Sequence, residues 1–93
     1  MEISKCNAEI KQLIDEHKLD DALAKVEEII ASGCADDMTY YFRGNAYRRC
    51  ENWKGAIDSY TQAIEMNPES PAVAARTMVI SILEFYNTDM YNH

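Results

Sequence analysis

The side chains best suited to binding chemistry lie close together in residues 38–57. This stretch contains four cationic residues and a single acid, Glu51, so its net charge is +3. The whole chain has a net charge of −7, which leaves −10 for the remaining residues. The spacing within the stretch puts Asn45, Arg48 and Arg49 on one face of a helix. Guanidinium and amide groups donate hydrogen bonds to carboxylates, so the stretch favours an acidic segment or a C-terminal carboxylate as ligand. The alternative is that these arginines are solvated or paired with acids of neighbouring helices.

The sequence offers no group of residues typical of an enzyme. His17 lies in a charged stretch between two expected helices, where a surface histidine is the simplest interpretation. The three glycines are too scattered for a phosphate-binding loop, since they stand at positions 33, 44 and 55. The acidic pairs 20–21 and 36–37 are typical of helix N-termini. We therefore expect no catalytic residues and no cofactor.

The cysteines argue against a metal site and indicate a reducing compartment. Cys6, Cys34 and Cys50 are widely spaced, form no CxxC pair, and are accompanied by only 2 histidines. A structural zinc site needs four such ligands at characteristic spacings, so none is expected. Free thiols are typical of a reducing environment, which predicts a cytoplasmic protein.

The composition excludes several classes of protein. A chain of 93 residues forms one small domain, and 3 Gly with 2 Pro are too few for collagen-like or low-complexity sequence. A net charge of −7 argues against nucleic acid and against an anionic membrane surface as partners. The first ten residues lack the apolar core of a secretory signal, and no apolar run is long enough to span a bilayer.

An internal repeat divides the chain. An offset of 34 residues aligns apolar positions throughout two adjacent units. The aligned pairs include Ala22 with Ala56, Leu23 with Ile57, and Ile30 with Ile64. We therefore expect a single domain made of a degenerate unit 3–36, a clear unit 37–70, a closing helix 71–86 and a tail 87–93.

Apolar spacings of three and four predict an all-α chain with five helices. Their expected ranges are 3–17, 19–32, 37–50, 53–66 and 72–86. Gly33 suits a left-handed C-cap and Asn52 an N-cap. Ser70 followed by Pro71 is a strong signal for the start of the last helix.

Residues 37–70 resemble the tetratricopeptide repeat, whose pattern of aromatic and small residues they reproduce. The matching residues are Tyr40, Gly44, Tyr47, Ala56, Tyr60, Ala63 and Pro68. The pattern departs at Arg43, where the family prefers Leu. The resemblance implies two antiparallel helix-turn-helix units and a capping helix in a short right-handed solenoid. The layout is also similar to small stand-alone bacterial proteins of this family.

The resemblance also implies a function and a binding surface. Proteins of this family bind a peptide or an extended protein segment in a concave groove lined by the first helix of each unit. The implied groove residues are Tyr41, Asn45, Arg48, Arg49 and Lys11, with Ala75, Val79 and Ile82 added by the closing helix. The family's carboxylate clamp is not reproduced, because Tyr41 stands where that clamp has a lysine.

The closing helix supports a second hypothesis, a protein that self-associates. Most of the circumference of 72–86 is apolar. This apolar surface is wider than the stripe that a single neighbouring helix can cover. Either the tail and helix 53–66 cover this surface, or a second copy does so in a homodimer, or another partner protein covers it. The candidate interface residues are Val79, Ile82, Leu83, Phe85 and Tyr86.

Overall fold

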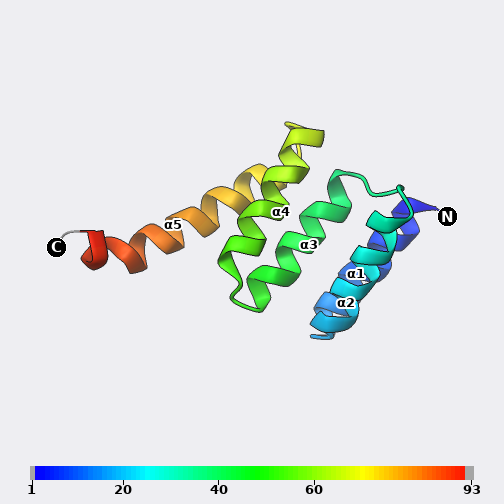
Figure 1. The fold of residues 1–93 in the computed structure, drawn as a ribbon, viewed down its shortest axis with the longest axis horizontal. Helices are drawn as coiled ribbons and strands as arrows, with labels where there is room; N and C mark the ends of the chain where they lie inside the picture. Colours follow the sequence, from blue (N-terminus) through cyan, green and yellow to red (C-terminus); the bar gives the residue numbers. More distant parts are fainter. Residues whose placement is uncertain (1, 92–93) are drawn as a thin grey trace.

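The computed structural model describes residues 2–91, with side chains for residues 2–85. This part of the chain is all-α, as predicted, and Figure 1 shows its helices in order. The helices are α1 (Ile3–Asp15), α2 (Leu19–Ala31), α3 (Asp37–Arg49), α4 (Trp53–Met66) and α5 (Ala72–Tyr91). The first four begin where the sequence predicts, and three of these end one or two residues early.

The helices form an elongated array of two antiparallel pairs followed by α5. α1 pairs with α2, α3 pairs with α4, and α3 also packs on both helices of the first pair. α5 packs chiefly on α4, and its C-terminal half extends beyond the other helices (Figure 1). The principal extents of 51 × 28 × 19 Å reflect this shape.

The turn inside each pair has the same left-handed conformation, although neither turn contains glycine there. His17 has φ 62° and Glu51, one 34-residue repeat later, has φ 60°. The backbone N–H groups of His17 and Lys18 donate to the carbonyls of Ile14 and Leu13 at 2.9 and 2.8 Å. This pattern satisfies the last carbonyls of α1, and the same bonds recur at the end of α3.

A buried polar cluster fixes the start of α3 and joins it to α1. The Asp36 carboxylate accepts from the Thr39 backbone N–H at 3.0 Å, and the Thr39 hydroxyl accepts from the Asp36 N–H at 3.2 Å. Asn7 on α1 donates to Asp36 Oδ1 at 2.9 Å and accepts from the Thr39 hydroxyl at 2.8 Å. The N-cap of the second repeat is thus completed by a side chain of the first.

Gly44 permits the close contact between α3 and α4. A Cβ at this position would lie 2.5 Å from Tyr60 Cδ1, closer than real Cβ atoms approach. The Tyr60 ring, fully buried at 0% exposure, fills this space. Gly44 therefore packs directly against Tyr60 at the contact between the paired helices.

The remaining expected caps are also present. Gly33 ends the turn after α2 with φ 80°, and Asn52 Oδ1 accepts from the Gly55 N–H at 2.9 Å. The Ser70 hydroxyl accepts from the Ala72 N–H at 3.1 Å, and the Pro71 carbonyl accepts from the Ala75 N–H. These signals account for the start of α5.

α5 uses a different face from the one that the repeat predicts. Ala72, Ala75 and Val79 correspond to groove positions of α3, yet they are buried in the core with Tyr60 and other α4 residues. The expectation that Ala75 and Val79 line the groove is therefore wrong. Small alanines let α5 approach α4 along this face, so α5 diverges from α3. The helix also continues to Tyr91, past the expected end at residue 86, because Gly and Pro are absent from 72–91.

The left-handed turn predicts a stabilising substitution. His17→Gly should raise the free energy of unfolding by about 1 kcal/mol, because glycine adopts positive φ without the steric cost of a Cβ. Gly33→Ala should lower it by a similar amount, since Gly33 has φ 80°. Urea denaturation followed by circular dichroism measures both. A destabilised His17→Gly variant would contradict the role of the turn.

The cluster at Asp36 predicts a pH dependence. Burial acts to raise the pKa of the Asp36 carboxyl, but hydrogen bonds from Asn7, Thr39 and the Met38 backbone outweigh it and hold the pKa below the usual 3.8. The ionised form therefore stabilises the fold above pH 3.8, and this contribution is lost as the pH falls through the lowered folded-state pKa. Asp36→Asn should lower the free energy of unfolding by about 1 kcal/mol at pH 7, because hydrogen bonds to a charged acceptor are stronger than those to a neutral one. The difference from wild type should narrow towards pH 3.

Urea denaturation at pH 7 and pH 3 measures the free energy of unfolding of Asp36→Asn and of wild type. Asp58→Asn is the control, since Asp58 is exposed. A difference between Asp36→Asn and wild type that stays constant with pH would refute the prediction.

Candidate functional site

Five of the eight residues predicted for a groove, those on α1 and α3, line one depression of about 380 Å³ between α1, α3 and the start of α5; Ile82, like Ala75 and Val79, does not line it. We call this depression the basic groove. Its lining consists of Lys11, Ile14, Asp15, Met38, Tyr41, Phe42, Asn45, Arg48, Arg49 and Pro71. Three cations against one acid give these side chains a net charge of +2, on a chain with net charge −7.

The cations of the basic groove have few internal partners. Lys11 Nζ lies 2.9 Å from Asp15 Oδ2, and both side chains are more than half exposed. Arg48 Nη1 lies 3.6 Å from the sulfur of Met78, a weak acceptor. Arg49 has no ion pair within the described residues. Most of the groove's positive charge is therefore available to a ligand.

A buried tyrosine holds the amide of the groove. The Tyr60 hydroxyl on α4 donates to Asn45 Oδ1 at 2.5 Å. Burial raises the pKa of Tyr60 to about 12, with Arg48 opposing and Tyr41 reinforcing the shift. The phenol therefore keeps its proton at physiological pH. Because Oδ1 is engaged, the Asn45 amide nitrogen is left to donate from the groove wall.

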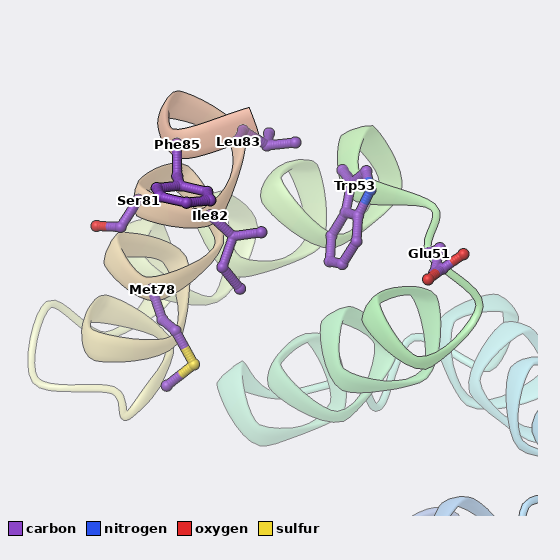
Figure 2. A pocket seen from close by; sticks show the side chains of 7 residues that line it. All are labelled: Glu51, Trp53, Met78, Ser81, Ile82, Leu83 and Phe85. Carbon is purple, nitrogen blue, oxygen red and sulfur yellow. The ribbon is translucent and has the colours of Figure 1, made fainter. Parts of the chain in front are cut away.

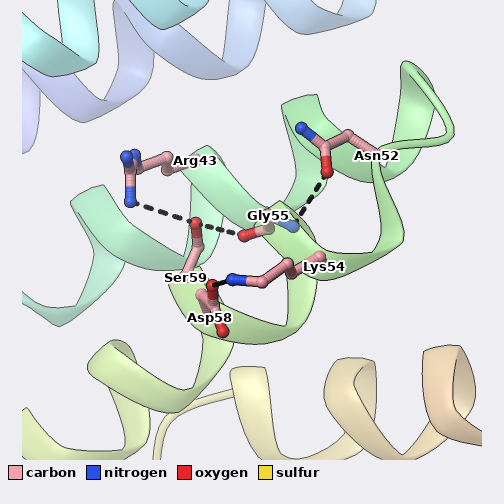
Figure 3. Close-up of polar contacts among 6 residues, drawn as sticks. All are labelled: Arg43, Asn52, Lys54, Gly55, Asp58 and Ser59. Carbon is pink, nitrogen blue, oxygen red and sulfur yellow. Dashed lines mark hydrogen bonds and ion pairs between the residues drawn. The ribbon is translucent and has the colours of Figure 1, made fainter.

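The other two cations of the basic stretch lie elsewhere. Arg43 lies 3.3 Å from Glu27 on α2, 3.4 Å from the Ser59 hydroxyl and 5.2 Å from the Tyr47 ring centre. Lys54 pairs with Asp58 at 3.0 Å (Figure 3). Both line a separate depression of about 230 Å³. Arg43 thus pairs with an acid of a neighbouring helix, as the alternative holds, whereas Lys54 pairs with an acid of its own helix.

A second and larger depression, which we call the apolar cleft, lies between α5 and the turn from α3 to α4 (Figure 2). Its volume is about 790 Å³. The residues that line it are Glu51, Trp53, Met78, Ser81, Ile82, Leu83 and Phe85. It exists because α5 diverges from α3 while remaining packed on α4.

The candidate self-association residues separate into three groups. Val79 is 0% exposed in the core between α4 and α5, so its assignment to an interface is wrong. Ile82, Leu83 and Phe85 line the apolar cleft, and Phe85 is 78% exposed. The side chain of Tyr86 lies outside the described residues.

Sequence reasoning missed the contributions of Tyr60 and Trp53. Tyr60 was expected only as a packing residue, and no spacing rule relates it to the Asn45 amide. Trp53 faces the apolar cleft because of the orientation of α5, which the repeat register does not predict. In the part of the chain described, no three His, Cys, Asp or Glu side chains gather as a metal site would require. Nor does any helix of that part have the length and apolar character to cross a membrane.

Comparison with known proteins agrees with the repeat. The tetratricopeptide repeat family matches residues 38–70, within one residue of the unit predicted here. The chain is 26% identical over 66 residues to tetratricopeptide repeat protein 17 of Mus musculus, covering 71% of this chain. It is 29% identical over 70 residues to tetratricopeptide repeat protein 16 of Homo sapiens, covering 75% of this chain. It spans only 6% and 8% of the lengths of those two proteins.

A solved structure extends the comparison to most of the fold. The solution NMR structure of Bacteroides fragilis protein BF1650 superimposes with a TM-score of 0.81 at 46% sequence identity. The match covers 92% of this chain and 88% of that protein, so it includes the degenerate first unit and α5. With the repeat motif, the paired helices and these relatives in agreement, residues 38–70 form a tetratricopeptide repeat, and the chain as a whole is similar to proteins of that family.

Proposed function

We propose that this chain binds an acidic segment, or a C-terminal carboxylate, of another protein in the basic groove. The observation that carries the proposal is that Lys11, Asn45, Arg48 and Arg49 line the same depression. Proteins of the tetratricopeptide repeat family are generally protein–protein interaction modules, which fits a binding role without catalysis. The cytoplasm is the compartment we assign, because its reducing conditions suit the free thiols of Cys6, Cys34 and Cys50.

The chemistry of the basic groove suits a carboxylate. Arg48 and Arg49 offer charge-assisted hydrogen bonds, and the Asn45 amide nitrogen offers a further donor between them and Tyr41. Lys11 is paired with Asp15 at the exposed edge of the groove, and its ammonium group has further N–H donors for a ligand carboxylate. Tyr41 and Phe42, with ring centres 5.3 Å apart, supply apolar surface beside these donors.

The proposal predicts a specific loss of binding. The double substitution Arg48→Ala with Arg49→Ala should weaken binding of a fluorescent hexaglutamate peptide by about tenfold or more, because two charge-assisted contacts are removed. Fluorescence anisotropy at low and high salt measures this. The wild-type affinity should fall as salt rises, since exposed charges are screened.

A charge-matched control separates the groove from general electrostatics. Lys5→Ala with Lys54→Ala also removes two positive charges, but both lysines lie outside the basic groove. If the two double variants lose the same affinity, or neither does, the groove is not the site. Circular dichroism should show unchanged helical content in both.

Self-association through α5 is the second candidate function. Large apolar side chains are exposed along this helix, including Met78 at 52% and Phe85 at 78%. Exposed apolar surface of this kind favours burial against another molecule. The described residues of α5 carry few charges, so a second copy would meet little repulsion there despite the acidic chain.

This candidate predicts a dimer that depends on the apolar cleft. Light scattering after size exclusion should give about twice 10.6 kDa for the wild type. Phe85→Glu should return the mass to that of a monomer, because it places a charge in the apolar cleft. Val73→Glu is the control, since Val73 is 42% exposed but lies outside the cleft. A wild-type monomer at every concentration would reject this candidate.

A further inference from the structure

The hydroxyl of Tyr60 has a single acceptor. Tyr60 is fully buried, and its hydroxyl proton is directed to Asn45 Oδ1. No other hydrogen bond of this hydroxyl occurs among the described residues. A buried hydroxyl proton without an acceptor costs free energy. The group that supplies the acceptor is therefore held with its oxygen turned towards Tyr60.

The constraint decides between the two orientations of the Asn45 amide. In the observed orientation, Oδ1 accepts from Tyr60 and Nδ2 remains for the basic groove. In the reversed orientation, Nδ2 would donate to the Tyr60 oxygen. The hydroxyl proton would then have no acceptor, and Oδ1 would face the groove instead. The burial of Tyr60 therefore disfavours the reversed amide.

The fixed amide matches its neighbours in the basic groove. Lys11, Arg48 and Arg49 carry only hydrogen-bond donors, and the acid Asp15 is already paired with Lys11. With Asn45 held as a donor, the charged and amide groups available to a ligand all donate. A carboxylate offers two acceptor oxygens to these donors, whereas an amide offers one, and the N–H groups of the amide find no acceptor among them.

We propose that Tyr60 is a positioning residue, which acts through Asn45 to make the basic groove selective for carboxylates over amides. This inference rests on the proposed function of the groove and assigns its ligand chemistry to carboxylates. Tyr60 lies behind α3 and does not line the groove, so its effect on a ligand is indirect.

The test compares matched peptides on Tyr60→Phe. Fluorescence anisotropy measures the Kd of three labelled peptides: hexaglutamate with a free C-terminus, the same peptide amidated, and amidated hexaglutamine. The wild type should prefer both glutamate peptides to hexaglutamine. Tyr60→Phe should reduce this preference by about tenfold, because the released amide can turn Oδ1 towards a glutamine N–H. The free and amidated glutamate peptides distinguish a terminal carboxylate from side-chain carboxylates.

Tyr40→Phe is the matched control. Tyr40 packs against the same core cluster as Tyr60, but its hydroxyl makes no hydrogen bond among the described residues. This substitution should leave the preference unchanged. If Tyr60→Phe weakens glutamate and glutamine peptides by the same factor, Tyr60 is only structural and the proposal is overturned. An unchanged preference overturns it as well.

A second readout needs no ligand. The Asn45 side-chain amide signals, assigned in ¹⁵N-labelled protein with the help of Asn45→Ala, report the orientation directly. Weak nuclear Overhauser contacts between the Nδ2 protons and the Tyr60 ring are expected, and strong ones would overturn the proposal. If no peptide binds the wild type, the proposed function fails. The amide signals then still decide whether Tyr60 fixes the orientation of the Asn45 amide.

Discussion

The contact between Gly44 and Tyr60 sets the spacing on which the rest of the molecule depends. Without a Cβ at Gly44, the Tyr60 ring can lie against the α3 backbone. From that position its hydroxyl reaches Asn45, and its ring joins the core shared with α5. One small residue thus connects the packing of a helix pair, the orientation of α5 and the polarity of the basic groove. Any side chain at this position would displace all three.

Much of the fold could be predicted because repeat proteins encode it locally. The offset of 34 residues, the apolar spacing and the cap residues such as Asn52 each depend on near neighbours in sequence. The basic groove followed from the same register, since equivalent positions of α1 and α3 face the same side. The residues predicted on α1 and α3 therefore line one depression, whereas those that the same register predicted on α5 do not.

The rest depends on packing that no single helix encodes. The sequence of α5 is apolar on most sides, so its orientation is decided by which face fits α4 best, and alanines at 72 and 75 fit more closely than larger side chains. Arg43 illustrates the same limit for charges. Its place in the sequence counts it among the cations of residues 38–57, but its side chain turns away from the groove to Glu27 and the Tyr47 ring.

The cluster of Asn7, Asp36 and Thr39 has a consequence for how the array comes apart. Because Asn7 completes the cap of α3, the first turn of the second repeat cannot fray without losing a bond to the first. In nearest-neighbour descriptions of repeat proteins, such a bond belongs to the coupling between units and not to either unit alone. The α1–α2 pair is therefore joined to α3 by polar bonds as well as by apolar packing, and we expect the two helix pairs to unfold cooperatively.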